Sequence, residues 1–448
     1  MKTILPENLI ALAKDCDKPL YLVGGSVRDF LSGMPKKTGN IDWDICSPTP
    51  VEEFRALAEK HAFEIKSCYK NTGTLKLKSA DGQEYEYTRF RSDKYIRGTH
   101  TPVEVYFTDD ICLDAKRRDF TANAVYYDIQ ADKFVDPLDG ITAIKEKRLS
   151  TVAPARKVFG EDGLRLLRLA RFCAELGFTP DENCLIGAKE NAKLIRDIAP
   201  ERIFAELSAI LIADTKYGVK DGHYRGFKIL DETRVLDEII PELTLGRGLT
   251  QRADFHNYDV LEHSLRALLH ADVSVRLPAL LHDIAKPLCH FRDGTSYLHP
   301  QEGETLCKKV LTRLKAPKKT VERTAKLTLY HMYDLNCQVR EVKLRRFLVE
   351  NYAILDELLL VKQADFSGCK DDLSIAPTVA RWKNLLAQMK KEKVPFTLKE
   401  MAVNGDDLLF LGMKKSVLSQ TLYKLLMHLT VNPQDNNKEK LLSLAPKL

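Results

Sequence analysis

The stretch "YLVGGSVRDFLSGMPKKTGNIDWDI", which runs from Tyr21 to Ile45, joins a glycine turn to two closely spaced carboxylates. The apolar run before the glycines predicts a strand, and the residues after them predict a helix. A second strand is predicted at "NIDWDIC". Because residues i and i+2 of a strand point to the same face, about 6.6 Å apart, Asp42 and Asp44 are expected to project side by side.

Paired carboxylates beside a glycine turn indicate phosphoryl-transfer chemistry. Two such carboxylates can hold two magnesium ions about 4 Å apart, one activating an attacking hydroxyl and the other neutralising a triphosphate. Gly24 and Gly25 would let backbone N–H groups approach the phosphates, near the positive end of the following helix. Arg28 would reach a phosphate or pair with a carboxylate of the site. Taken alone, these residues also fit a solvated strand face and a plain turn.

Two further segments strengthen the catalytic interpretation. "KRRDFTANAVYYD" places Arg117, Arg118 and Asp119 next to a strand, and guanidinium groups suit phosphate and ribose recognition. Glu86, in "EYEYTRFR", is a candidate third carboxylate on another strand. Short β-like runs alternate with a helical pattern at residues 50–61, so the first 140 residues are predicted to form a mixed α/β domain.

From about Thr142 the sequence predicts helices almost throughout. "FGEDGLRLLRLARFCAELG", residues 159–177, is amphipathic and ends at a glycine, which is typical of a single helix and its terminus. A chain of 448 residues is too long for one compact core, so several domains are expected. We predict a head at 1–140, a helical neck at 141–225, a helical body at 226–395 and a helical tail at 396–448.

Composition places the chain among globular proteins. It is 44% hydrophobic and 29% charged, with no apolar run near the ~18 residues of a membrane span and no signal-peptide pattern, so a cytoplasmic location is expected. Ten cysteines without a C-x-x-C pair argue against a zinc finger or a disulfide framework and indicate reduced thiols. A net charge of +6 weakly favours a polyanionic partner.

The histidines are clustered. Seven of the eleven fall between His256 and His331, a stretch of 76 residues in which an even spread would place about two. This concentration predicts a second functional site, separate from the paired carboxylates.

The chain resembles the class II tRNA nucleotidyltransferases, which comprise the CCA-adding enzymes and their bacterial poly(A) polymerase relatives. The resemblance rests on segments in the family's order: "GGSVRD" with "DWD", "RRDFTANA", "DPLDG", "EDGLRLLRLARF", "APERIFAEL", "FHNYDVLEHSL", "LLHDIAKP" and "NGDDLLFLG". It implies an α+β protein whose polymerase-β-like nucleotidyltransferase head is followed by an all-helical neck, an HD-containing body and a tRNA-binding tail. It also implies magnesium in the head, and tRNA, CTP and ATP as partners.

The resemblance assigns base choice to the segment "EDGLR" and adds Arg168 to the nucleotide-binding set. If Asp162 and Arg165 are i and i+3 on one helix, they are neighbours on one face. An aspartate accepts and an arginine donates, which matches the Watson–Crick edges of cytosine and adenine but leaves buried polar groups unpaired against uracil and guanine. Each mismatch would cost about 1 to 3 kcal/mol. A surface ion pair at helix spacing is the alternative.

The histidine cluster matches the metal set of HD phosphohydrolases. The matching residues are His263, His282, Asp283 and Asp365, and imidazole and carboxylate ligands suit a divalent metal. His299 and His331 match further family histidines, which would hold a second metal or a phosphate. The alternative is a vestigial HD fold that only holds RNA.

The segment "SDKYIRGTHTP", Ser92 to Pro102, corresponds to a flexible loop that the family's A-adding members carry, or to an ordinary hairpin connection. We interpret the chain as an enzyme that adds CCA to tRNA 3′ ends with release of pyrophosphate. An A-adding enzyme or poly(A) polymerase, and an RNA-binding HD phosphohydrolase with an inactive head, remain alternatives. Oligomeric state is not indicated by the sequence.

Overall fold

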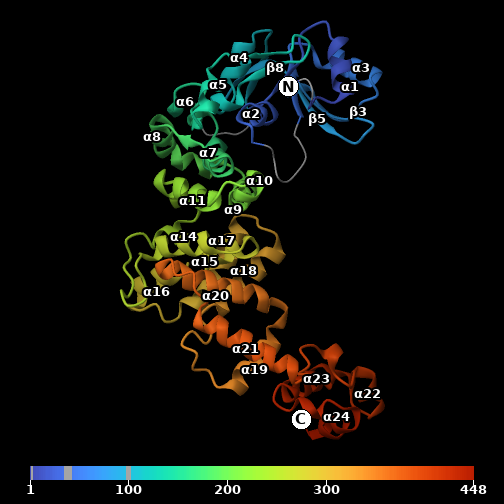
Figure 1. The fold of residues 1–448 in the computed structure, drawn as a ribbon, viewed down its shortest axis with the longest axis vertical. Coiled ribbons are helices and arrows are strands. Elements are labelled where there is room, and N and C mark those ends of the chain that lie inside the picture. Colours follow the sequence, from blue (N-terminus) through green and yellow to red (C-terminus); the bar gives the residue numbers. More distant parts are fainter. Residues whose placement is uncertain (2–3, 35–42, 97–101, 448) are drawn as a thin grey trace. The chain divides into compact units, whose positions relative to one another are not determined.

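The computed structural model describes residues 1, 4–34, 43–96 and 102–447. The chain forms two compact units, one of Met1–Thr244 with Arg313–Ala316 and one of Leu245–Thr312 with Pro317–Leu448. Figure 1 shows that the labelled strands all belong to the first part of the chain, whereas the later elements are helices. The predicted mixed α/β head followed by helices is therefore confirmed.

A seven-stranded sheet forms the framework of the head. In spatial order its strands are β3 (Glu64–Tyr69), β4 (Thr74–Lys78), β5 (Glu84–Arg89), β2 (Trp43–Ser47), β1 (Tyr21–Val23), β8 (Tyr126–Asp128) and β9 (Lys133–Val135). β2 and β5 run parallel, and the other neighbouring pairs are antiparallel. The register aligns Asp44 with Val23 on one side and with Glu86 on the other.

The remaining elements of the first unit are two small sheets and thirteen α-helices within the described ranges. The small sheets pair β6 (Arg91–Lys94) with β7 (Glu104–Phe107) and β10 (Arg148–Leu149) with β11 (Thr179–Pro180). The helices are α1 (Glu7–Lys14), α2 (Gly25–Ser32), α3 (Val51–Lys60), α4 (Ile111–Lys116), α5 (Gly140–Lys145), α6 (Ala155–Glu161), α7 (Leu164–Leu176), α8 (Glu182–Asn191), α9 (Pro200–Leu211), α10 (Ala213–Tyr217), α11 (Gly222–Glu232), α12 (Val235–Ile239) and α13 (Pro241–Thr244).

The second unit is helical in the residues that the structure describes. Its helices are α14 (Val260–His270), α15 (Arg276–Leu281), α16 (Lys286–Asp293), α17 (His299–Arg313), α18 (Lys318–Tyr330), α19 (Glu341–Glu350), α20 (Leu355–Lys370), α21 (Pro377–Lys391), α22 (Gly405–Phe410), α23 (Lys415–Leu429) and α24 (Lys438–Leu444). α14 packs against α20, which brings His263 and Asp365 into one core. Across the described ranges, no helix is both long enough and apolar enough to span a bilayer.

The predicted single helix over residues 159–177 is wrong. The chain leaves α6 at Asp162, whose backbone is extended (φ −141°, ψ 108°), and α7 begins at Leu164. Gly163 lies between the two helices, and a Cβ atom there would stand 2.6 Å from the carbonyl oxygen of Leu194, so this close approach requires glycine. The predicted glycine terminus is confirmed, because Gly177 caps α7 with φ +69°.

The predicted loop from Ser92 to Pro102 has different bounds. Ser92, Asp93 and Lys94 belong to β6 and pair in register with β7, because strand hydrogen bonds extend the hairpin beyond the expected start of the loop. Residues 97–101 lie outside the described residues. The hairpin connection therefore starts at Tyr95, three residues later than the sequence suggested.

Candidate functional site

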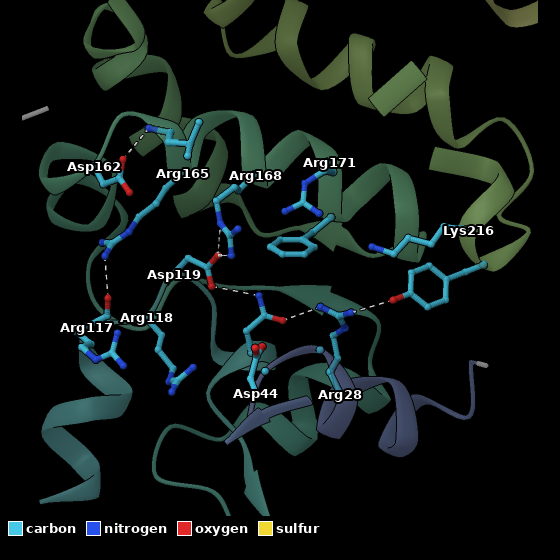
Figure 2. Close-up of a pocket in the computed structure, with 16 residues that line it drawn as sticks. Arg28, Asp44, Arg117, Arg118, Asp119, Asp162, Arg165, Arg168, Arg171 and Lys216 are labelled. Carbon is cyan, nitrogen blue, oxygen red and sulfur yellow. Dashed lines mark hydrogen bonds and ion pairs between the residues drawn. The ribbon is translucent and has the colours of Figure 1, made fainter. Parts of the chain in front are cut away.

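The first unit contains a cavity of about 400 Å³ where the ends of β1 and β2 face the neck helices. Figure 2 shows its charged side chains converging from both sides. The lining residues are Gly24, Gly25, Arg28, Asp44, Arg117, Arg118, Asp119, Asn123, Asp162, Leu164, Arg165, Arg168, Arg171, Phe172, Lys216 and Tyr217. Seven of these are basic and three are acidic, so the cavity favours a polyanion.

The glycine turn and Asp44 meet at one end of this cavity. Gly24 has φ +78°, and a Cβ atom there would stand 3.0 Å from Oδ2 of Asp44. Only glycine combines this backbone conformation with open space beside the carboxylate. Asp42 lies outside the described residues, so its pairing with Asp44 stays a prediction. Glu86 is aligned with Asp44 but does not line the cavity, and its carboxylate lies 4.0 Å from Lys76 Nζ.

Arg28 is buried and pairs with groups of the protein. Its guanidinium donates to Asp29 at 2.6 Å, to Asn123 at 2.7 Å and to the hydroxyl of Tyr217 at 3.2 Å. Arg28 lines the cavity but Asp29 does not, so the predicted role of Arg28 toward a phosphate or a carboxylate of the site stays a prediction. Tyr217 also donates to Asp29 at 2.7 Å, so this network joins α2 to α10.

Asp119 connects the same network to α7. Its Oδ2 accepts a hydrogen bond from Arg168 Nε at 2.8 Å and forms an ion pair with Arg168 Nη2 at 2.6 Å, and its Oδ1 accepts from Asn123 at 3.1 Å. Burial opposes ionisation of this carboxyl, but the Arg168 guanidinium outweighs it and lowers the pKa of Asp119 to about 2. Asp119 is therefore ionised at neutral pH and holds Arg168 at the cavity wall.

The side chain of Asp114 orients two arginines of the cavity. This residue was not predicted from the sequence. This fully buried carboxylate accepts from Arg117 at 2.7 Å, from Arg118 at 3.0 Å and from the Tyr126 hydroxyl at 2.7 Å. Asp114 precedes the arginines by three and four residues in "LDAKRRD". That spacing is the one at which helical side chains meet, so it would have pointed to the contact.

Asp162 and Arg165 both line the cavity, although they do not share a helix. The Asp162 carboxylate accepts from the backbone N–H of Leu164 at 2.9 Å. The Arg165 guanidinium donates to the carbonyl oxygens of Val158 at 3.0 Å and Arg117 at 2.7 Å, and lies 5.5 Å from the ring centroid of Tyr95. These contacts fix the direction of the arginine.

Six further lining residues were not predicted: Asn123, Leu164, Arg171, Phe172, Lys216 and Tyr217. The Phe172 ring is surrounded by guanidinium groups, with Arg171 at 4.5 Å, Arg168 at 5.0 Å and Arg28 at 5.3 Å from its centroid. The spacing in "RLLRLARF" predicted a helix, but it did not indicate which arginines would contact the Phe172 ring. Lys216 and Tyr217 come from α10, and no sequence pattern linked that helix to the head.

The second unit gathers the predicted histidine–aspartate residues into one buried centre. His263 Nε2 lies 3.0 Å from His282 Nε2, 3.2 Å from Asp283 Oδ2 and 3.2 Å from Asp365 Oδ1. On the other side of Asp283, Oδ1 lies 3.2 Å from His299 Nε2 and 3.5 Å from His331 Nε2. Asp283 thus lies between two sets of ligand atoms, and the residues proposed from sequence are all brought together.

The chemistry of this centre fits a bound cation. Backbone carbonyls lie 2.7 Å from Nδ1 of His282, 2.6 Å from Nδ1 of His299 and 2.6 Å from Nδ1 of His331, which favours neutral rings with Nε2 lone pairs facing inward. Both carboxylate oxygens of Asp283 are buried without a hydrogen bond from any described residue, although Lys286 Nζ forms an ion pair with Oδ2 at 2.6 Å. Lone pairs that converge in this way form a ligand set for a divalent metal.

Protonation of a histidine is an alternative way to compensate the buried carboxylates of this centre. Burial disfavours the charged form of His282, but Asp283 and Asp365 outweigh it and raise the pKa of His282 to about 10. Burial lowers the pKa of His331 to about 4. The two carboxylates therefore favour a protonated His282, whereas burial favours a neutral His331, whose Nε2 lies 3.2 Å from Nε2 of His299.

Two family models match the first unit. Residues 20–150 match the poly A polymerase head domain, and residues 177–245 match a probable RNA- and SrmB-binding site of polymerase A. The cavity residues from Gly24 to Asn123 lie in the first matched segment, and Lys216 and Tyr217 lie in the second.

Several known proteins are similar to this chain in sequence or in fold. An A-adding tRNA nucleotidyltransferase of Deinococcus radiodurans is 32% identical over 77% of this chain and 75% of its own length. A CCA-adding enzyme of Lactococcus lactis is 33% identical over 59% of this chain and 65% of its own length. A solved CCA-adding enzyme of Bacillus stearothermophilus in complex with CTP shares the fold with a TM-score of 0.67 and 23% identity, covering 99% of this chain and 98% of its own.

Proposed function

The chain belongs to the class II CCA-adding enzyme and poly(A) polymerase family, and from this premise we propose that it adds CCA to tRNA 3′ ends from CTP and ATP, releasing pyrophosphate. The observation that carries the proposal is one cavity with Asp44 at one end and Asp162 with Arg165 at the other. In this proposal the two ends hold the reacting phosphate and the base of a single nucleotide.

The triphosphate would lie between the glycine turn and the arginines. Gly24 and Gly25 keep the backbone close to Asp44, and Arg118 supplies positive charge that Asp114 orients from behind. Magnesium held by Asp42 and Asp44 would activate the attacking tRNA hydroxyl and neutralise the leaving pyrophosphate. We keep Glu86 as a proposed third carboxylate, because it is aligned with Asp44 on β5.

The base would be read by Asp162 and Arg165. Their roles do not require the helix spacing that the sequence suggested, because both side chains reach the cavity from the α6–α7 junction. The Asp162 carboxylate accepts and the Arg165 guanidinium donates, a pairing that fits cytosine and adenine. Since Arg165 is held by two backbone carbonyls, its direction would be set before the nucleotide binds.

Incorporation of labelled nucleotides separates the candidate activities. A CCA-adding enzyme extends tRNA that lacks CCA with CTP and then ATP, whereas an A-adding enzyme extends only tRNA that already ends in CC. The A-adding alternative is supported by the Deinococcus radiodurans relative, which matches 77% of the chain. Failure to incorporate CTP, with ATP added to tRNA ending in CC, would replace the first proposal by the second.

We also propose that the histidine–aspartate centre binds a divalent metal and hydrolyses phosphate esters. His263, His282, Asp283 and Asp365 would hold the metal, and His299 with His331 would hold a second metal or the substrate phosphate. The metal would supply Lewis-acid activation of the phosphate. Metal analysis of the purified chain before and after chelation tests this proposal, and an absence of bound divalent metal at saturating manganese or nickel would contradict it.

A further inference from the structure

A third group of potential ligands lies beside the histidine–aspartate centre of the second unit. It consists of His256, His263 and Cys369, and one ligand atom of each lies within 4.8 Å of the other two. His263 is shared with the centre, whereas His256 and Cys369 are not used by it. They come from the segment before α14 and from the end of α20.

One ring nitrogen of each histidine in this group lacks a hydrogen bond. Nδ1 of His256 and Nδ1 of His263 are buried and have no hydrogen-bond partner in the part of the chain that the structure describes. The His263 side chain is 0% exposed, so water does not reach it from bulk solvent. A buried polar atom left unpaired costs about 1 to 3 kcal/mol, which a bound ligand would relieve.

The group is also held together by the surrounding structure. The His256 and His263 rings meet edge to face, with centroids 4.8 Å apart. The backbone N–H of Asn257 donates to the carbonyl oxygen of Cys369 at 3.0 Å, which ties the segment bearing His256 to the end of α20. Cys369 Sγ donates to the Asp365 carbonyl oxygen at 3.3 Å. The three ligands are therefore fixed relative to one another without a metal.

We propose that His256, His263 and Cys369 form an additional site, which shares His263 with the neighbouring centre, for a thiophilic divalent cation such as zinc. Two imidazoles and a thiolate are a donor set that zinc favours, whereas the neighbouring centre offers only nitrogen and oxygen. A neutral imidazole binds a metal through one nitrogen. If Nδ1 of His263 binds zinc, its Nε2 carries the proton and donates toward Asp283 and Asp365, each 3.2 Å away.

Zinc binding through Nδ1 of His263 would change the ligand set of the neighbouring centre. Zinc at the thiolate site withdraws His263 from the ligand set of the histidine–aspartate centre, because the Nε2 lone pair is then protonated. Zinc binding also releases the Cys369 thiol proton. The inference goes beyond the proposed transfer and phosphohydrolase activities, and neither activity is needed to test it.

Cobalt(II) titration of the metal-free full-length chain tests the site, because cobalt bound to a thiolate shows a sulfur-to-cobalt charge-transfer absorption that nitrogen and oxygen ligands do not produce. We expect the wild-type chain to develop this absorption with one equivalent and the Cys369→Ser variant to lose it. The Cys337→Ser variant is the matched control, since Cys337 is also a partly buried free thiol of the same unit. It should keep the absorption.

Two further variants separate the possible outcomes. The His282→Ala/Asp283→Ala variant lacks two ligands of the neighbouring centre and should still show the charge-transfer absorption. His256→Gln should weaken cobalt binding at least tenfold, which tests the site even if Cys369→Ser does not fold. No absorption in the wild-type chain, its persistence in folded Cys369→Ser, or unchanged affinity in His256→Gln would each overturn the proposal.

Discussion

The cavity of the first unit has seven basic side chains against three acidic ones, whereas the centre of the second unit sets four histidines against two carboxylates. In the cavity, the buried carboxylates of Asp114 and Asp119 hold arginines whose side chains line the open space. In the centre, acceptor atoms face one another at 3.0 to 3.5 Å. The first arrangement is complementary to an anion and the second to a cation.

This difference explains why the two regions are expected to act separately. The cavity is lined by arginines, which stay charged at all accessible pH values. The metal binding proposed for the second centre requires neutral imidazoles, because only an unprotonated ring nitrogen can hold a metal. Variants that remove one of these features are therefore expected to leave the other intact.

The largest effect is expected for Asp44→Asn. Removing the carboxylate beside Gly24 should lower nucleotide addition by about a thousandfold or more, because it takes away a proposed magnesium ligand. Labelled CTP and ATP incorporation measures the loss, with circular dichroism as a check on folding. Glu84→Gln, an exposed carboxylate two residues before Glu86 on β5, is the control and should stay near wild type. Turnover near the wild-type rate in Asp44→Asn would exclude the metal role.

The His282→Ala/Asp283→Ala variant addresses the other region. It should lose bound divalent metal and any phosphohydrolase activity at the histidine–aspartate centre, because two proposed ligands are gone. Nucleotide addition should remain within about twofold of wild type, since no step of the transfer uses this metal. Both activities are measured on one preparation. Loss of transfer in a folded double variant would mean that the two sites are coupled.

A moderate effect is expected at the base-reading end. Asp162→Ala or Arg165→Ala should reduce the preference for CTP over UTP by about 1 to 3 kcal/mol, because the unpaired polar groups that penalise the wrong base disappear. Competing incorporation of CTP and UTP gives the ratio. Arg148→Ala, an arginine paired with Glu146 outside the cavity, should leave the ratio unchanged. If UTP is still excluded as strongly in both cavity variants, the base-reading role is wrong.

The smallest effect concerns stability and pH. Asp119 has its pKa lowered from 3.8 to about 2, so its ionised form stabilises the fold above pH 4, and this contribution is lost as pH falls toward 2. Asp119→Asn should therefore be about 2 kcal/mol less stable at pH 6, with the difference shrinking between pH 4 and pH 2. Thermal unfolding of both proteins across that range measures the gap.

Asp109→Asn is the matched control for this experiment. Asp109 forms an exposed ion pair with Lys18 at 2.9 Å, and such pairs contribute about 0 to 1 kcal/mol. A gap between wild type and Asp119→Asn that does not change with pH would show that Arg168 is not held through the ionised carboxylate.

Sequence reasoning predicted the features that depend on local patterns. The glycine turn, the strand bearing Asp44, the helical remainder and the clustering of His263, His282, Asp283 and Asp365 all follow from short segments, and the structure has them. The break between α6 and α7 is not visible in such a segment, and Gly163 at the break packs closely against Leu194, thirty-one residues away along the chain. Periodicity alone continued the helix through that point.

The cavity wall contributed by α10 could not be predicted for a similar reason. Lys216 and Tyr217 reach the cavity only because α10 and α11 pack against α7, and Tyr217 then meets Arg28, 189 residues earlier. Asp114 is different, since its spacing to Arg117 and Arg118 was visible in the sequence. A search for acidic residues at helical spacing from these arginines would have added Asp114 to the predicted site.

The most direct test of the account is a crystal structure of the Asp44→Asn variant with CTP and a tRNA acceptor stem lacking CCA. The account predicts a triphosphate beside Gly24, Gly25 and Arg118, and a cytosine edge against Asp162 and Arg165, within the same cavity. A nucleotide bound with its base away from Asp162 and Arg165, or its phosphates away from the glycine turn, would contradict the assignment of this cavity to nucleotidyl transfer.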